Sequence, residues 1–343
     1  MDGYFASAGL LSLATACVYF GSYSSLPAPR NSDGSRPVDD IPERVSSEDA
    51  LLFPIIGAVT LLALFFSLQY FGPEWINFLL GWYFAIAGVA AVWKALIAVA
   101  RWALGEASWR SYPDVSLDAR LGQKNFFNVS LSSVSACLLP LAFVPSAVYM
   151  LNGRSALLTN VLGVSFATAA IAMLKIDSFS TGCIMLSGLF FYDVYFVFYS
   201  AKTFGQSVMV KVATSVDVPI KLLWPRSVVL STANGFSMLG LGDIVVPGVF
   251  VALALRYDHF RAGAPSHTNF KRPYFYTTLA AYVLGLLTTV VVMHTFQSAQ
   301  PALLYLSPAG ILSVLLTSFV RGELGAVFAW SDVESEPVKS KSE

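Results

Sequence analysis

The chain has 343 residues, of which 56% are hydrophobic and only 12% are charged, and its formal net charge is zero. Soluble domains carry about 25% charged residues, so half of the usual charged complement is missing. The apolar residues also come in runs of about 20, the length of helix that crosses a hydrocarbon core. These features exclude an ordinary soluble domain, and the balanced charge gives no indication of a nucleic-acid partner.

Nine membrane-spanning helices are predicted from the apolar runs, which makes the fold class an all-α polytopic membrane protein. The first run has no positively charged residues before it, and it continues through Tyr23, so we interpret it as a span rather than a cleaved signal peptide. Pro140 and Pro145 lie inside the fourth run and predict a kink there. The runs cover residues 3–24, 51–72, 74–99, 131–151, 155–174, 178–200, 232–255, 274–296 and 300–320.

The distribution of basic residues predicts the orientation of these helices. Among the connections and tails, 15 Lys and Arg residues lie on the side that faces residues 25–50, and 5 lie on the other side. Because positive residues accumulate on the cytosolic side, we expect a lumenal N-terminus and a cytosolic C-terminus. The connection 201–231 carries four of those five and opposes the trend locally.

Polar segments divide the chain into three predicted parts. Residues 1–130 hold three spans and a proline-rich polar linker at 25–50, which has no core-forming pattern. Residues 131–320 hold the other six spans, and residues 321–343 form a cytosolic tail. In the final sequence KSKSE, Lys339 and Lys341 fit a dilysine signal that returns membrane proteins to the endoplasmic reticulum. A chance pair of lysines is an equal alternative.

Two acidic residues stand inside predicted spans, Asp193 in FFYDVYFVF and Asp243 in MLGLGDIVVPG. A charge at the centre of a membrane helix costs about 2.5–3.5 kcal/mol, and neither span contains a Lys or Arg to pair with it. The two spans are consecutive and therefore antiparallel, and the acids lie about 10 and 16 Å from the lumenal ends at 1.5 Å per residue. We expect the two carboxylates to face each other at one depth.

Two carboxyl groups in contact in low-dielectric surroundings cannot both ionise, so the pair shares one proton. Such a pair can hydrolyse a peptide bond. The ionised member takes a proton from the attacking water, while the protonated member polarises the carbonyl and then protonates the leaving nitrogen. Because this chemistry requires water but no metal, cofactor or nucleophilic side chain, the two acids predict an aspartyl protease.

Glycine and proline lie beside these acids and in the last span. Gly240 and Gly242 weaken the helix around Asp243 by about 1 kcal/mol each relative to alanine, and they allow another backbone to come close. An extended substrate would need that room, but glycine pairs also pack membrane helices together, so both roles stay open. Pro301, in QPALLYLSP, is suited to the first turn of the last span.

Taken together, these stretches resemble one family, the intramembrane aspartyl proteases, whose two branches are presenilin and signal peptide peptidase. The family motifs YD, GxGD and PAL occur here in order on the sixth, seventh and ninth spans. The longer stretches FFYDVYFVF, PIKLLWP, MLGLGDIVVPGVFVALALRYD and QPALLYLSP are similar to the signal peptide peptidase branch. The resemblance is strong over residues 166–320 and weak before residue 131.

The resemblance implies a role for each matching residue. Asp193 and Asp243 would be the catalytic pair, and Tyr192 would pack beside them. The other residues would line the site or position the substrate: Gly240, Leu241, Gly242, Gln300, Pro301, Ala302 and Leu303.

The resemblance also implies substrates, a location and partners. Substrates would be signal peptides left by signal peptidase, together with type II and tail-anchored membrane proteins, cut within the bilayer of the endoplasmic reticulum. Fragments would leave towards the cytosol. Self-association and contact with the degradation machinery of that organelle would follow from the family and are not indicated by these residues.

Two other functions remain open from the sequence. A proton-coupled transporter would also place acids inside the membrane, but it would leave the Pro301 stretch without a role, and paired halves are not evident. A protein that binds misfolded membrane helices without cleaving them is the second alternative.

Overall fold

The computed structural model describes residues 2–27, 43–105, 114–121, 124–151, 155–226, 235–263, 270–296 and 300–332, with backbone alone for 2–4, 43–44, 114–121 and 124–132. Within these residues, eight helices are long and apolar enough to cross a membrane. The prediction of an all-α polytopic membrane protein is confirmed. The eight are α1 (Asp2–Ser24), α2 (Ser47–Phe71), α3 (Pro73–Leu104), α5 (Ser133–Leu151), α6 (Ala156–Met173), α7 (Phe179–Val194, continuing through a π-helical turn Tyr195–Tyr199 into α8, Ser200–Phe204), α11 (Pro273–Phe296) and α12 (Leu303–Val320).

The remaining predicted span, 232–255, differs from the prediction in its first half. Residues 236–240 form a strand, β6 (Phe236–Gly240), which pairs antiparallel with β5 (Lys221–Pro225), and the helix α10 begins only at Gly242 and runs to Ala262. Gly235 has a φ of 75°, a conformation that ends regular helix or strand, and the glycines before Asp243 disfavour helix. Every 18-residue stretch of α10 contains three charged residues, so α10 is not among the eight apolar helices.

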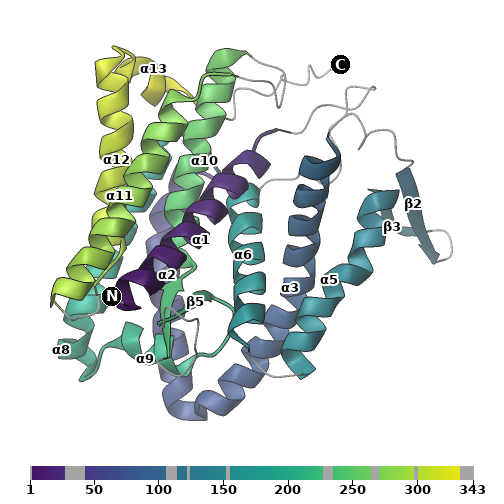
Figure 1. Ribbon diagram of the computed structural model, residues 1–343, viewed down its shortest axis with the longest axis horizontal. Helices are drawn as coiled ribbons and strands as arrows, with labels where there is room; N and C mark the ends of the chain where they lie inside the picture. The colour runs from purple at the N-terminus through teal and green to yellow at the C-terminus, as the bar shows by residue number, and fades with distance from the viewer. Residues whose placement is uncertain are drawn as a thin grey trace.

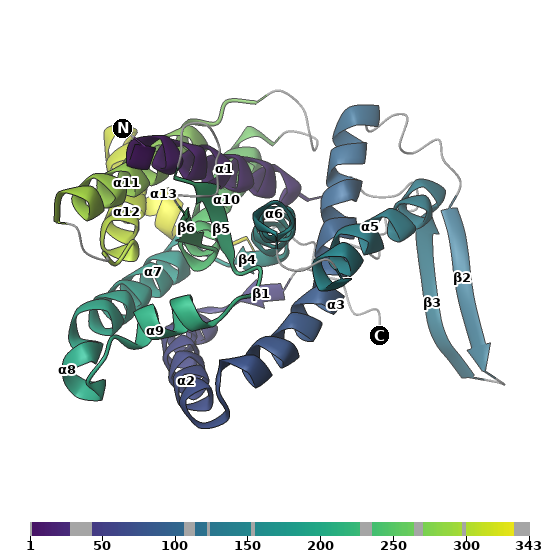
Figure 2. The same ribbon diagram turned by 60° about the horizontal axis from the view of Figure 1, so that its bottom comes forward.

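The helix α10 forms the centre of the molecule. All of its residues from 247 to 258 are buried, and it packs against α1, α6, α7, α11 and α12. Close packing depends on small residues, because a side-chain carbon on Gly248 would lie 2.7 Å from Ile171. Figures 1 and 2 show α10 enclosed by this group, which we call the central helices.

The helices α2, α3 and α5 lie at the side of the central helices, and we call them the peripheral helices. Figure 2 shows α2 and α3 diverging from each other, and beyond α5 a hairpin of β2 (Asp114–Leu121) and β3 (Lys124–Ser132) that the sequence did not predict. Their exposed faces are rich in large apolar side chains, as expected for surfaces in contact with lipid. On α3 these include Trp75, Phe78, Trp82, Tyr83 and Trp102.

Segments far apart in the sequence meet at one end of the helices, the end where α13 (Leu324–Ala329) lies. In Figure 1 this is the end opposite α8 and α9 (Val208–Ser215). The strand β1 (Glu43–Val45) pairs in parallel with β4 (Leu174–Ile176). Within the predicted linker 25–50, β1 and the start of α2 are therefore regular structure. The amide of Asp332 donates to the carbonyl of Asp177 at 2.8 Å.

A buried ion pair fixes the same end to α10. Arg256, only 3% exposed, donates to the carbonyl of Ile176 at 3.1 Å, and its Nε lies 3.1 Å from Oδ2 of Asp332. These contacts connect α10, the junction before α7 and the segment after α13.

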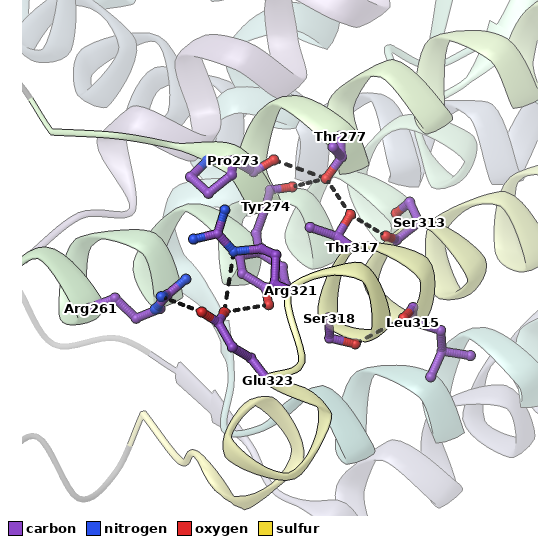
Figure 3. Close-up of polar contacts among 10 residues, drawn as sticks. All are labelled: Arg261, Pro273, Tyr274, Thr277, Ser313, Leu315, Thr317, Ser318, Arg321 and Glu323. Carbon is purple, nitrogen blue, oxygen red and sulfur yellow. Dashed lines mark hydrogen bonds and ion pairs between the residues drawn. The ribbon is translucent and has the colours of Figure 1, made fainter.

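Figure 3 shows a polar cluster around Glu323, where α10 and α12 end and α11 begins. The Glu323 carboxylate lies 2.7 Å from Nη2 of Arg261 and 3.3 Å from Nε of Arg321, and it accepts a hydrogen bond from the Tyr274 hydroxyl at 3.0 Å. Partial desolvation would raise the pKa of Glu323, but the bond from Tyr274 and the two nearby arginines outweigh it and hold the pKa below its ordinary value.

Candidate active site

Asp193 lies near the end of α7 and is 2% exposed. Its Oδ2 accepts a hydrogen bond from the backbone N–H of Leu303 at 3.0 Å. The helix changes to π-helical hydrogen bonding two residues later, at Tyr195–Tyr199, a distortion that is frequent at functional sites.

The donor of this bond is the first residue of α12. Helical N–H groups of the first turn have no partner within the helix and attract negative charge, so the start of α12 is suited to hold a carboxylate. Pro301 lies two residues before the helix, and its carbonyl accepts from the N–H of Leu304 at 3.3 Å. Pro301 was predicted to lie in the first turn, but the helix begins two residues after it. That difference is within the ordinary spread of helix boundaries. Pro301, Ala302 and Leu303 are all buried.

Asp243 lies in the first turn of α10 and is half-buried. A side-chain carbon on Gly240 would have Oδ2 of Asp243 as its nearest neighbour, at 3.6 Å, and one on Gly242 would meet nothing within 4 Å among the described residues. Neither glycine therefore packs against another helix in the described part of the chain. The open space beside the acid leaves room for another backbone.

The structure brings the three sequence motifs together. The carboxylates of Asp193 and Asp243 are close enough to interact electrostatically, and Tyr192 interacts with both. The Tyr192 ring is half-buried and packs on Phe196 with ring centroids 4.8 Å apart. Leu241 and Gln300 are half-buried beside the other motif residues, and Gly242 is exposed.

The strand β6 is the part of the site that the sequence analysis missed. It ends at Gly240, and the next residue, Leu241, donates its N–H to the carbonyl of Ile220 at 2.9 Å. In Figure 2, β5 and β6 lie among α1, α6 and α10, with which they are in contact. The pair of glycines at positions 235 and 240, at the two ends of an apolar stretch, is the signal from which the strand could have been inferred.

The described residues include no group of three or more His, Cys, Asp or Glu side chains that could hold a metal ion. The chemistry available at the site is that of two carboxyl groups, one tyrosine and the backbone N–H of Leu303.

Comparison with known proteins identifies the family. Residues 38–334 match the family model described as signal peptide peptidase. Human signal peptide peptidase is 36% identical over 336 residues, which are 96% of this chain and 83% of the human protein. The chain belongs to the signal peptide peptidase family. A probable intramembrane protease of Schizosaccharomyces pombe is 35% identical over 84% of both chains, and intramembrane protease 2 of Caenorhabditis elegans is 41% identical over 57% of this chain and 42% of its own.

Membership of the signal peptide peptidase family agrees with the resemblance drawn from the three motifs. Together with the eight apolar helices, it makes the protein a multi-pass membrane protein of a family of intramembrane proteases.

Proposed function

We propose that this protein is an aspartic endopeptidase that hydrolyses peptide bonds within membrane-spanning segments, with Asp193 and Asp243 as general acid and base. The observation that carries the proposal is the arrangement of two acids from α7 and α10 within electrostatic range, one of them held by the N–H of Leu303. A pair of this kind shares one proton and so contains a base and an acid at the same time.

The reaction requires a water molecule and no other cofactor. The ionised carboxylate removes a proton from water as the water oxygen attacks the scissile carbonyl carbon. The protonated carboxyl donates to the carbonyl oxygen and then passes a proton to the leaving nitrogen. The N–H of Leu303 stabilises negative charge on Asp193 during these steps.

The proposed substrates are signal peptides that remain after signal peptidase cleavage, and type II membrane proteins. The names of the human and mouse relatives support a signal peptide as the first substrate to test. The proposed topology has nine spans, with α10 as the seventh in chain order beside the eight apolar helices, a lumenal N-terminus and a cytosolic C-terminus. The proposed location is the membrane of the endoplasmic reticulum. Lys339 and Lys341, the predicted retrieval signal, lie outside the described residues.

Cleavage of a labelled signal peptide by purified protein in detergent tests the proposal. Asp193→Ala and Asp243→Ala should each abolish cleavage, whereas Asp217→Ala, which changes an exposed acid outside the site, should leave the rate unchanged. Cleavage that persists in either of the first two variants would exclude the two-aspartate mechanism. A wild type that cuts nothing but shows proton-driven uptake in liposomes would favour a transporter, and binding of membrane helices without cleavage would favour a scaffold.

A further inference from the structure

A buried tyrosine of α11 has a hydroxyl that forms no hydrogen bond with the described part of the chain. Tyr282 is 2% exposed, and its Oη has no hydrogen-bond partner among the described residues. Buried tyrosine hydroxyls almost always find a partner, and leaving one unpaired in an apolar interior is unfavourable. The presence of an unpaired hydroxyl at this buried position therefore needs an explanation.

A strong acceptor, the Asp243 carboxylate, lies within electrostatic range of Tyr282. The ring belongs to the same buried cluster as Ile244, the residue after Asp243, and as Leu303. Its hydroxyl interacts electrostatically with Asp243 from α10 and with Cys17 from α1. A thiol is a weak hydrogen-bond partner, so of these two groups the Asp243 carboxylate is the one suited to satisfy the hydroxyl.

The two acids differ in whether a hydrogen-bond donor is bound to the carboxylate. Asp193 accepts a hydrogen bond from Leu303 at 3.0 Å, whereas the Asp243 side chain accepts none from the described residues. The α7 groups that interact with Asp243 are Asp193 and Tyr192. One acid of the pair therefore has a fixed donor, the other lacks one, and a donor without an acceptor lies within electrostatic range of it.

Packing of α11 against α12 fixes the position of this donor. One turn after Tyr282, Gly285 faces α12 so closely that a side-chain carbon there would lie 3.2 Å from Cδ2 of Leu306 and 3.3 Å from its Cα. Residues three apart on a helix share a face, so the same close contact that holds α11 against α12 also sets where the Tyr282 ring lies. The start of α12 supplies the donor for Asp193, and α11 carries the candidate donor for Asp243.

We propose that Tyr282 is a positioning residue of the aspartate pair, and that its hydroxyl donates through one water molecule to the Asp243 carboxylate. A bridging water transmits a hydrogen bond nearly as well as direct contact, and it fits two groups that interact without touching. The bond would hold the Asp243 carboxyl in one orientation and stabilise its ionised form. This inference rests on the proposed two-aspartate function.

The test compares Tyr282→Phe with the wild type in the full-length protein, with the labelled signal peptide as substrate. Because the variant loses one bond to a carboxylate, kcat should fall about 10- to 100-fold with little change in KM. The acid limb of the kcat–pH profile should move to higher pH, because the ionised form of the pair loses a donor. A hydroxyl-containing transition-state mimic should bind more weakly by the same factor as kcat falls.

The matched control is Tyr149→Phe, which removes a hydroxyl from an equally buried tyrosine, also 2% exposed, on the peripheral helix α5. It should change neither kcat nor the pH profile. A wild-type kcat and pH profile in Tyr282→Phe would overturn the inference, as would a lower kcat with an unmoved acid limb. Loss of thermal stability with an unmoved acid limb would show that the hydroxyl serves packing only. Cleavage by Asp243→Ala would instead refute the proposed function, so the two failures are distinguishable.

Discussion

The central helix α10 and the peripheral helix α2 show opposite relations between composition and burial. The helix α2 is long and apolar enough to cross a membrane, yet of its 25 residues only Ala50, Phe65 and Leu68 are buried. The helix α10 carries Asp243, Arg256 and Asp258, and its residues from 247 to 258 are all buried. Because lipid solvates apolar side chains, apolar surface need not be hidden in a bilayer, whereas polar groups must be enclosed by protein. The central helices therefore carry the polar chemistry, and the peripheral helices provide a lipid-facing surface.

The largest expected difference between the two regions is in activity. Asp243→Asn keeps the size of the side chain but removes an ionisable group, so the cleavage rate should fall about 10²- to 10⁴-fold. Trp82→Leu, a large change on the lipid-facing side of α3, should leave the rate within about twofold, since surface changes seldom matter. Initial rates on the labelled signal peptide measure both. An equal loss of cleavage rate in Trp82→Leu would contradict the assignment of activity to the central helices.

The buried ion pair of the central helices should give the largest effect on stability. Arg256→Met removes the ion pair to the Asp332 carboxylate and the hydrogen bond to the Ile176 carbonyl, which should lower the free energy of unfolding by about 3 kcal/mol. Lys94→Met, at an exposed position of α3, should change it by less than about 0.5 kcal/mol. Thermal unfolding in one detergent, followed by circular dichroism, compares the two, and similar midpoints would contradict the assignment of Arg256 to a structural pair.

Glycine-to-alanine changes should have opposite signs in the two regions. On α7, a side-chain carbon at Gly182 would lie 2.7 Å from the ring of Phe250, so Gly182→Ala should destabilise by about 1–3 kcal/mol through overpacking. On α2, the nearest atom to such a carbon at Gly57 is 3.9 Å away, so Gly57→Ala should stabilise by up to about 1 kcal/mol through helix propensity. The same thermal unfolding experiment measures the stability of both variants. Equal destabilisation of Gly182→Ala and Gly57→Ala would refute the expected difference between the central and peripheral helices.

The smallest expected effect lies at the ends of the central helices. Glu323→Gln should lower the free energy of unfolding by less than about 1 kcal/mol at neutral pH, because its ion pairs are partly exposed. The pKa of Glu323 is lowered in the folded protein. Its contribution is therefore complete above the pKa of the unfolded chain and is lost as the pH falls through the folded value. The difference between wild type and variant should shrink on acidification, and a difference that grows would be inconsistent with this role.

Helices and motifs were predictable from the sequence because each has a local cause. Runs of about 20 apolar residues define spans, and eight of the nine predicted spans correspond to apolar helices of the structure. The juxtaposition of Asp193 with Asp243 was predictable because consecutive spans run antiparallel and the two acids lacked any other partner. In the case of Leu303, the sequence indicated proximity to the site, but the use of its N–H by Asp193 depends on where α12 begins.

Apart from the glycines at the two ends of β6, the sequence contains no local indication of the strands, and the reason is physical. Whether residues 236–240 continue a helix or pair with β5 depends on a partner segment 11 or more residues away, and an apolar stretch satisfies either conformation. The pairing of β1 with β4 likewise joins segments separated by four predicted spans. The role proposed for Tyr282 was not predictable from the sequence either. A tyrosine in an apolar run is ordinarily a packing residue, and only the structure shows that its hydroxyl has no partner among the described residues.

The composition of α10 has a consequence for how the protein is made. A segment enters the membrane from the translocation channel when its own transfer into lipid is favourable, and each Asp or Arg opposes that transfer, by about 2.5–3.5 kcal/mol at the helix centre and by less towards the helix ends. With Asp243, Arg256 and Asp258 in one helix, α10 is poorly suited to enter lipid alone. Helices synthesised before it, α1, α6 and α7, are among those that enclose it in the finished protein. Its insertion should therefore depend on their prior assembly, so that the helix bearing one of the proposed catalytic acids joins the membrane together with the helix bearing the other.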